Sequence, residues 1–183
     1  SGMQFLLLSF LLAGCSLSKI GMNAISRKAE RIGLEERLLS AEGQNLRYWV
    51  GGEGPPVLLL HGFGGDGLST WQGQLKAFAA DHTVIIPDLL WFGESNSQAA
   101  PSLTLQATAQ LALLDHLGLD RIDVVGISYG GFVTLRLFQL APQRLSRIVI
   151  VDSPGPLFSE DDALDLAARF NVTDPEELFV PQT

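Results

Sequence analysis

The strongest indication of the fold is the segment Val124-Val125-Gly126-Ile127-Ser128-Tyr129-Gly130-Gly131. It places a Gly-x-Ser-x-Gly pattern between an apolar run, residues 122–127, and a run with helical spacing. A serine at such a tight strand-to-helix turn takes a strained backbone conformation and exposes its hydroxyl to substrate. Glycine is needed at Gly126 and Gly130 because side chains two residues from the serine would collide with the turn. The pattern predicts a nucleophile at Ser128.

The segments around this turn alternate between strand-like and helix-like runs. Continuous apolar runs predict buried strands at 57–60, 84–87, 122–127 and 147–151, and helical spacing predicts helices at 71–80, 103–117 and 131–140. Two short strands before them, joined at a turn with Gly43, predict a hairpin. This alternation is typical of an α/β fold. We expect a mostly parallel sheet flanked by helices, with an N-terminal antiparallel hairpin.

Composition describes a globular chain of about one domain. The 183 residues are 46% hydrophobic and 17% charged, which is ample for a sizeable core. The net charge of −8 and the pI near 4.7 argue against a nucleic-acid partner, because phosphate binding requires a basic face. We expect neither a cofactor nor a metal site.

The N-terminal segment differs from the rest. Its apolar run over residues 5–13 is too short to span a bilayer but suits the core of a signal peptide. Leu12-Ala13-Gly14-Cys15 resembles a bacterial lipobox, and this resemblance implies cleavage before Cys15 and a lipid anchor on it. Such a protein would be exported and held on the periplasmic side of a cell envelope membrane. The alternative is a buried apolar helix with an incidental cysteine.

The sequence divides into four segments on these grounds. Residues 1–14 comprise two residues of expression-tag type, Ser1 and Gly2, followed by the predicted signal peptide from Met3. Residues 15–34 are a tether or short helix. Residues 35–158 are the N-terminal part of the catalytic core. Residues 159–183 combine an acidic face with an apolar one and are predicted to begin a cap.

Two further motifs precede the serine turn and carry a family resemblance. His61-Gly62-Phe63-Gly64-Gly65 follows one predicted strand, and a loop from Pro87 to Ser95 follows the next. The strand-to-helix turn around Ser128 has the form of a nucleophile elbow. Together with this elbow, the two motifs stand in the order found in the α/β-hydrolase family, which the chain resembles from Glu35 to Ser153. Trp91 stands where the family often has glycine. The pattern is most similar to lipases, esterases and carbon–carbon-bond hydrolases with a helical cap.

The resemblance assigns roles to the loops around Ser128. The oxyanion formed when Ser128 attacks a carbonyl needs two backbone donors. The N–H of Tyr129, the residue after the nucleophile, is one, and the resemblance implies that the N–H of Phe63 is the other. His61 and Gly62 shape the oxyanion loop. Dehalogenases and epoxide hydrolases on this fold use aspartate at the elbow, which disfavours both activities here.

A general base for Ser128 is not evident. The chain holds only His61, His82 and His116, predicted to lie respectively at the oxyanion loop, at a strand start and on a helix flank. The family places its acid and histidine after two further strands, so we expect these 183 residues to be one piece of a longer or two-piece enzyme. Asp152, at the end of the last predicted strand, is a candidate acid; alternatively it bonds nearby backbone N–H groups.

The sequence therefore predicts a serine hydrolase. Its substrate would be a small-molecule carboxylic ester or related carbonyl compound, processed through an acyl-enzyme on Ser128. The alternatives are a non-catalytic binding or scaffold protein on the same fold, and a perhydrolase or acyltransferase. A second chain or a further C-terminal part would complete the fold.

Overall fold

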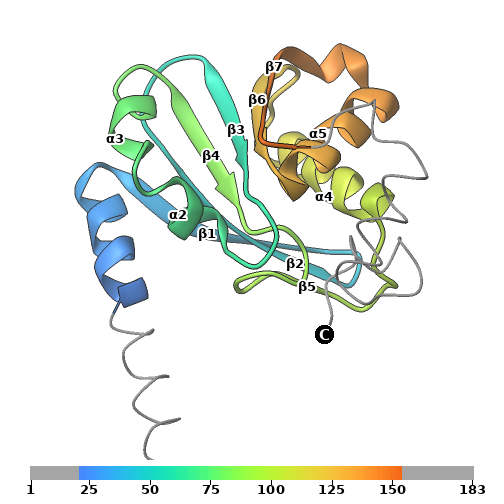
Figure 1. The fold of residues 1–183 in the computed structure, drawn as a ribbon, viewed down its shortest axis with the longest axis horizontal. Coiled ribbons are helices and arrows are strands. Elements are labelled where there is room, and N and C mark those ends of the chain that lie inside the picture. The colour runs from blue at the N-terminus through green and yellow to red at the C-terminus, as the bar shows by residue number, and fades with distance from the viewer. Residues whose placement is uncertain (1–20, 154–183) are drawn as a thin grey trace, which may run out of the picture.

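A computed structural model describes residues 21–153, which form one mixed sheet between two helical layers (Figure 1). The strands are β1 (Leu34–Ala41), β2 (Gln44–Gly51), β3 (Pro56–Leu60), β4 (Thr83–Pro87), β5 (Asn96–Ser97), β6 (Ile122–Ile127) and β7 (Leu145–Val151). They are ordered β1-β2-β4-β3-β6-β7, with the short β5 beside β2. β4, β3, β6 and β7 are parallel, whereas β1, β2 and β5 pair antiparallel. The predicted α/β-hydrolase class is confirmed.

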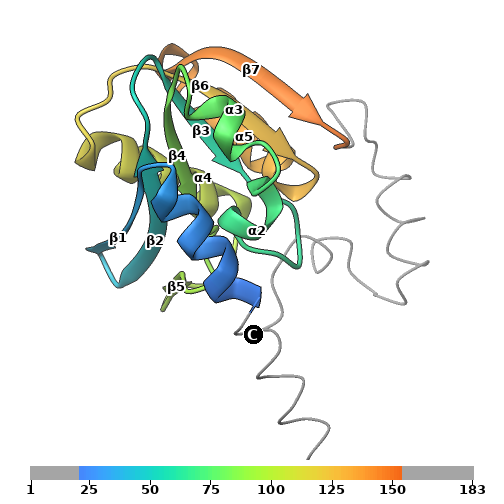
Figure 2. The ribbon, with the colours of Figure 1, turned by 90° about the vertical axis from the view of Figure 1, so that its left-hand side faces the viewer.

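Helices cover both faces of this sheet. A helix over residues 21–31, α2 (Gly67–Trp71) and α3 (Leu75–Phe78) lie on one face. α4 (Leu103–His116) and α5 (Tyr129–Leu140) lie on the other, and the one-turn η1 (Pro142–Arg144) leads into β7. Figure 2 shows the first layer facing the viewer, in front of the sheet. This sandwich is the expected consequence of parallel strands that are apolar on both faces.

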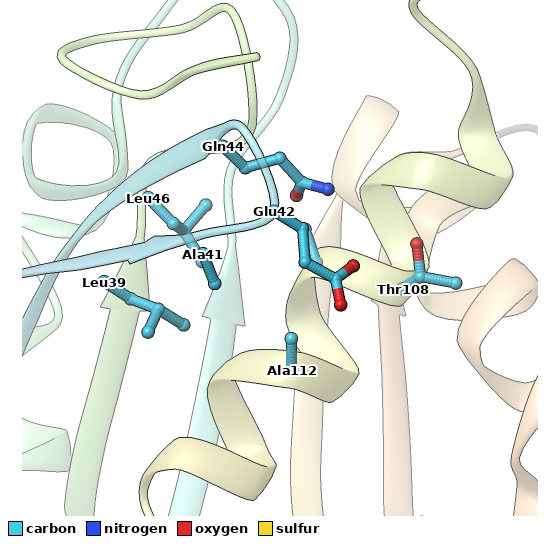
Figure 3. A pocket seen from close by; sticks show the side chains of 8 residues that line it. Leu39, Ala41, Glu42, Gln44, Leu46, Thr108 and Ala112 are labelled. Atoms are coloured by element: carbon cyan, nitrogen blue, oxygen red, sulfur yellow. The ribbon is translucent and has the colours of Figure 1, made fainter. Parts of the chain in front are cut away.

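The N-terminal hairpin was predicted correctly. Ala41 pairs with Gln44 across a two-residue turn, in which Glu42 and Gly43 have φ values of 51° and 75°. Two consecutive left-handed residues are the signature of the hairpin turn whose twist matches the strands. The hairpin end lies over α4 and leaves a hollow of about 150 Å³ between Leu39, Leu46 and Ala112 (Figure 3).

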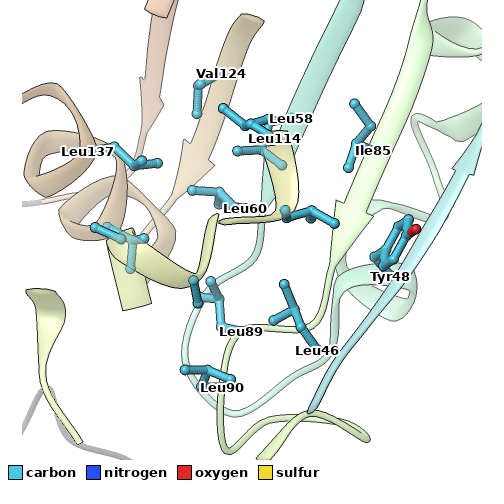
Figure 4. Close-up of a cluster of buried hydrophobic side chains, with 14 of the residues drawn as sticks. Leu46, Tyr48, Leu58, Leu60, Ile85, Leu89, Leu90, Leu114, Val124 and Leu137 are labelled. Atoms are coloured by element: carbon cyan, nitrogen blue, oxygen red, sulfur yellow. The ribbon is translucent and has the colours of Figure 1, made fainter. Parts of the chain in front are cut away.

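The core consists of two hydrophobic clusters, one on each side of the sheet. Leu58 and Leu60 of β3 point into the cluster under α4 and α5 (Figure 4), and Val57 and Leu59 point into the cluster under α2 and α3. All four are at most 3% exposed. Each buried aliphatic side chain contributes roughly 1.5–3 kcal/mol. Burial on alternating faces explains why the central strands are continuously apolar in sequence.

The single helix predicted over residues 71–80 is wrong. α2 begins earlier, because the Asp66 carboxylate accepts a hydrogen bond from the Ser69 N–H at 2.7 Å and so caps a helix at Gly67. α2 ends at Trp71, and α3 begins only at Leu75. Trp71 and Leu75 both reach the core across this break, which mimics the periodicity of one continuous helix.

Part of the segment expected as a tether packs on the domain. Ala29, in the helix over residues 21–31, is fully buried in the same cluster as Trp49. The Lys28 ammonium also donates to the Gln72 carbonyl at 3.2 Å. β1 then begins at Leu34. Within residues 21–153, no helix is both long and apolar enough to cross a bilayer.

Candidate active site

Ser128 lies at the junction of β6 and α5 in a strained conformation. Its backbone has φ 51° and ψ −117°, far from the regions that L-residues usually occupy. Its N–H donates to the Val151 carbonyl at 3.0 Å, and its carbonyl accepts from Gly131 N–H at 2.9 Å, so both sides of the turn are fixed. The residue is exposed. The neighbouring structure therefore maintains a strained serine in contact with solvent.

The flanking glycines are sterically required, as predicted. A Cβ on Gly126 would lie 2.4 Å from the Gly130 carbonyl oxygen and 2.4 Å from Thr134 Oγ1. A Cβ on Gly130 would lie 2.4 Å from the carbonyl oxygen of Leu60 and 2.6 Å from that of His61. These obstacles are mostly backbone atoms, which cannot rotate away. α5 can therefore approach β3 closely enough to form the elbow only with glycine at both positions.

The predicted oxyanion loop lies directly beside Ser128. A Cβ on Gly62 would be 3.2 Å from Ser128 Cβ and 3.8 Å from its Oγ. The backbone N–H groups of Phe63 and Tyr129 donate no hydrogen bond to any residue between 21 and 153. The Phe63 ring meets the Tyr129 ring edge to face, with centroids 6.1 Å apart. The loop and the first turn of α5 thus leave two unused donors near one hydroxyl.

His61 is a structural residue in this arrangement. It is fully buried, its Nε2 accepts from the Leu89 N–H at 2.9 Å, and its Nδ1 lies 2.7 Å from the Gly62 carbonyl oxygen. The first contact fixes the tautomer, so Nδ1 carries the proton and donates to Gly62. Burial lowers the pKa of His61, which keeps the ring neutral. With both nitrogens occupied, His61 fixes the oxyanion loop and cannot deprotonate Ser128.

The buried, neutral His61 is expected to make stability depend on pH. In the unfolded chain it titrates near pH 6.5, whereas the folded protein resists its protonation. The contribution of His61 to the free energy of unfolding is therefore complete above pH 6.5. It falls by up to about 1.4 kcal/mol per pH unit as the pH decreases below that value. Urea unfolding of the wild type and of His61→Gln should show their stability difference shrinking below pH 6.5. A difference that stays constant with pH would contradict this assignment.

Asp88 joins the two loops that follow β3 and β4. Its carboxylate accepts from Arg47 Nε at 2.7 Å, from the Gly67 N–H at 2.9 Å and from the Glu94 N–H at 3.0 Å. Arg47, which lies on β2, is 6% exposed and Asp88 is fully buried. The carboxylate is therefore a cross-link between α2, the loop after β4 and the hairpin. Asp88 is therefore a structural residue that shapes these loops.

Replacing Arg47 is expected to lower the free energy of unfolding strongly. Arg47→Met leaves the Asp88 carboxylate buried without its charged partner, which typically costs about 3–5 kcal/mol of unfolding free energy. Arg37→Met is the matched control, because Arg37 pairs with Glu35 on the exposed face of β1. Chemical denaturation should show a large loss for the first variant and no measurable loss for the second. Equal midpoints would show that the Arg47–Asp88 pair does not hold the loops.

Trp91 occupies a position where the resemblance leads one to expect glycine. It adopts φ 66°, the left-handed conformation that glycine tolerates best. Its N–H donates to the Ser95 carbonyl at 3.1 Å, and the Ser95 hydroxyl donates to the Asp88 carbonyl at 2.9 Å. The loop thus keeps a glycine-like shape around a large aromatic side chain.

Asp152 and the remaining histidines do not meet Ser128. Asp152 follows β7 with φ 47°, is exposed, and its carboxylate makes no hydrogen bond with the part of the chain that the structure describes. The expected bonding to backbone N–H groups is therefore not seen there. His82 precedes β4 and so lies at the N-terminal end of the parallel strands, opposite the end that carries Ser128, with Nδ1 2.5 Å from Asp81 Oδ1. His116 is exposed at the end of α4.

Two structural residues near the site were missed by the sequence analysis. Besides Arg47, the fully buried Gln106 of α4 bonds both the N–H and the carbonyl of Leu90 at 2.9 Å. Gln106 thereby fixes the loop after β4. The available signal was a polar side chain inside an otherwise apolar strand or helix. The predicted lipidation site Cys15, the 1–14 segment and the cap lie outside the described residues and stay predictions.

The chain matches known proteins over most of its length. The family described as alpha/beta hydrolase fold matches residues 55–179. A dihydrolipoyllysine-residue acetyltransferase component of an acetoin cleaving system from Pseudomonas putida is 41% identical over 116 residues, which cover 62% of this chain and 31% of the relative. A 2-hydroxymuconate semialdehyde hydrolase from Pseudomonas sp. (strain CF600) is 32% identical over 155 residues, which cover 82% of this chain and 53% of the relative.

A solved structure also matches the fold of this chain. The epoxide hydrolase CorEH without ligand superposes with a TM-score of 0.65 and 28% identity, over 75% of this chain and 50% of that one. Together these matches span between 31% and 53% of the lengths of the three proteins. The chain belongs to the alpha/beta hydrolase fold family and shares sequence with hydrolases of that family.

Proposed function

We propose that the protein is a serine hydrolase that cleaves small carboxylic esters or related carbonyl substrates through an acyl-enzyme on Ser128. The observation that carries this proposal is the elbow itself. Ser128 is exposed at φ 51° and ψ −117°, with glycines on both sides that no other residue could replace. Strained backbone conformations of this kind cluster at active sites, which supports a role for Ser128 as nucleophile.

The surrounding backbone supports carbonyl chemistry. Attack by Ser128 Oγ gives a tetrahedral oxyanion, and the free N–H groups of Phe63 and Tyr129 are the proposed donors to it. Tyr129 also begins the 12-residue α5, whose N-terminal end carries partial positive charge. Each preorganised donor is typically worth about 3 kcal/mol in the transition state. The charge would therefore develop where the fold already stabilises it.

Serine at the elbow argues for an acyl substrate. Attack on an ester breaks its C–O bond, releases the alcohol and gives an acyl-serine, which water hydrolyses in a second step to release the acid and regenerate the serine. Attack on an epoxide would give a serine ether, which water does not cleave, so turnover would stop. Similarity to an epoxide hydrolase structure therefore indicates the fold and not the reaction. The acetyltransferase and semialdehyde hydrolase relatives fit chemistry at a carbonyl carbon.

The proposed reaction also needs a general base that deprotonates Ser128, and residues 21–153 place none beside it. All three histidines of the chain lie in described segments, and none is within hydrogen-bonding distance of Ser128. We propose that the base is supplied by a further part of the protein or by another chain. The alternative function is that of a binding protein that retained the fold without catalysis.

Chemical rescue separates these two functions. A fluorophosphonate probe reacts with activated serines, and added imidazole can replace an absent histidine base. For the 183-residue chain we expect slow labelling that accelerates as imidazole is added and disappears when the protein is unfolded. No labelling at any imidazole concentration, with the fold intact by circular dichroism, would favour the non-catalytic function.

A further inference from the structure

A hollow of about 560 Å³ lies next to the oxyanion loop. It is lined by residues 63–66 of that loop, by Ser69 of α2, and by residues 91–93 of the loop after β4. The lining combines three aromatic side chains, Phe63, Trp91 and Phe92, with one carboxylate, Asp66. Because Phe63 also presents the proposed oxyanion donor, a molecule whose carbonyl meets Ser128 could extend into this hollow.

Asp66 lines the hollow with an incompletely used carboxylate. The residue is only 7% exposed, and Oδ1 accepts from the Ser69 N–H at 2.7 Å. Oδ2 accepts no hydrogen bond from any residue between 21 and 153. The capping interaction fixes the side chain, and the second oxygen keeps its capacity to bind a ligand. Oδ2 is not one of the fully buried side-chain atoms of the described residues, so solvent reaches it and a ligand in the hollow can take the place of that solvent.

The aromatic side chains provide faces beside this carboxylate. Phe63 is 52% exposed and meets Phe92 edge to face, with centroids 5.2 Å apart and planes at 80°. Phe92 in turn packs edge to face on His61, which anchors it. Ring faces attract cations, because the face of an aromatic ring is the negative end of its quadrupole.

No positive charge competes for this carboxylate. None of the residues lining the hollow is basic. Arg47 of β2, which holds the loop after β4, is already within 4 Å of three other carboxylates, those of Glu36, Asp88 and Glu94. The net charge of −8 adds to the negative potential. The hollow is therefore suited to a cationic group and unsuited to an anionic one.

We propose that this hollow binds a quaternary or protonated amine, so that the preferred substrates are esters or other acyl compounds that carry a cationic group. The cation would lie against the ring faces of Phe63 and Trp91, with Asp66 as its counter-ion. The inference rests on the proposed function for the position of the carbonyl. The binding preference itself does not require Ser128 to react.

Equilibrium binding tests the proposal without turnover. Choline and 3,3-dimethyl-1-butanol have nearly the same shape and differ in charge, and their binding to the 183-residue chain can be followed by ligand-observed NMR. We expect choline to bind about tenfold more tightly. Asp66→Asn keeps a helix-capping side chain and should reduce this preference several-fold, leaving the affinity of the neutral alcohol unchanged. Ser128→Ala should retain the preference.

A second variant tests the proposal independently in case Asp66→Asn does not fold. Phe63→Leu keeps an apolar side chain but removes a ring face, so it should weaken choline binding several-fold and affect the neutral alcohol little. Equal affinities for the two probes in the wild type would overturn the proposal, as would a preference that is undiminished in Asp66→Asn. Absent fluorophosphonate labelling with an intact choline preference would instead refute only the serine hydrolase assignment.

Discussion

Ser128→Ala should abolish fluorophosphonate labelling of the chain. Alanine has no nucleophile, and removing the serine of a hydrolase typically lowers reactivity by about a thousandfold or more. The fold should be unaffected, because alanine and serine meet the same strain at φ 51°. The measurement is the imidazole-accelerated rate of labelling, compared between variant and wild type at equal concentrations of folded protein.

Ser153→Ala is the matched control for this loss. Ser153 lies close to the elbow, since a Cβ on Gly131 would be 2.5 Å from its Oγ, but its hydroxyl is buried and has no hydrogen-bond partner among residues 21–153. Its removal should leave labelling at the wild-type rate. Labelling that survives in Ser128→Ala, or that depends on Ser153, would assign the nucleophile elsewhere.

Gly130→Ala should be the most destabilising of the small substitutions. The added methyl group would lie 2.4 Å from the Leu60 carbonyl oxygen, so α5 and β3 must separate or distort. Overpacking against backbone of this kind costs about 3 kcal/mol. Gly126→Ala meets the Gly130 carbonyl at the same distance and should behave similarly. Urea unfolding followed by circular dichroism gives both values.

Gly73→Ala is the control for these two variants. Gly73 lies between α2 and α3, its φ is not positive, and a Cβ there would meet nothing within 4 Å. It should be neutral or stabilising by up to about 1 kcal/mol, because alanine reduces the freedom of the unfolded chain. If Gly130→Ala were as stable as Gly73→Ala, the close packing of the elbow on β3 would be wrong.

The sequence predicts what depends on local pattern. Leu58 and Val124 belong to continuous apolar runs, and such runs identify central strands because both faces are buried. Gly43 marks the hairpin, and the elbow needs Gly126 and Gly130 for steric reasons that the sequence alone conveys. The fold class and the position of Ser128 follow from these features.

Features that depend on contacts between distant segments could not be predicted. Arg47 and Asp88 are separated by 41 positions, and nothing local shows that they pair. The break between α2 and α3 is hidden because Trp71 and Leu75 pack into one cluster from two helices. The strain at Trp91 is likewise invisible, because the hydrogen bonds that hold the loop in shape come from Ser95 and Gln106.

The acid and base that the proposed function requires beside Ser128 are not found among residues 21–153. Asp152 lies close to the elbow in the fold, since Val151 accepts the Ser128 N–H, but its carboxylate is exposed and contacts no histidine. Its role as the acid stays a prediction. An acid contributes only by orienting a histidine, so it is informative only once that histidine is found.

Peptide mass spectrometry of the labelled chain tests the central claim most directly. The 183-residue protein is treated with the fluorophosphonate in the presence of imidazole, digested, and searched for the modified residue. We predict a single adduct, on Ser128 between Ile127 and Tyr129. An adduct on any other serine, or no adduct on folded protein, would contradict the assignment of Ser128 as the nucleophile.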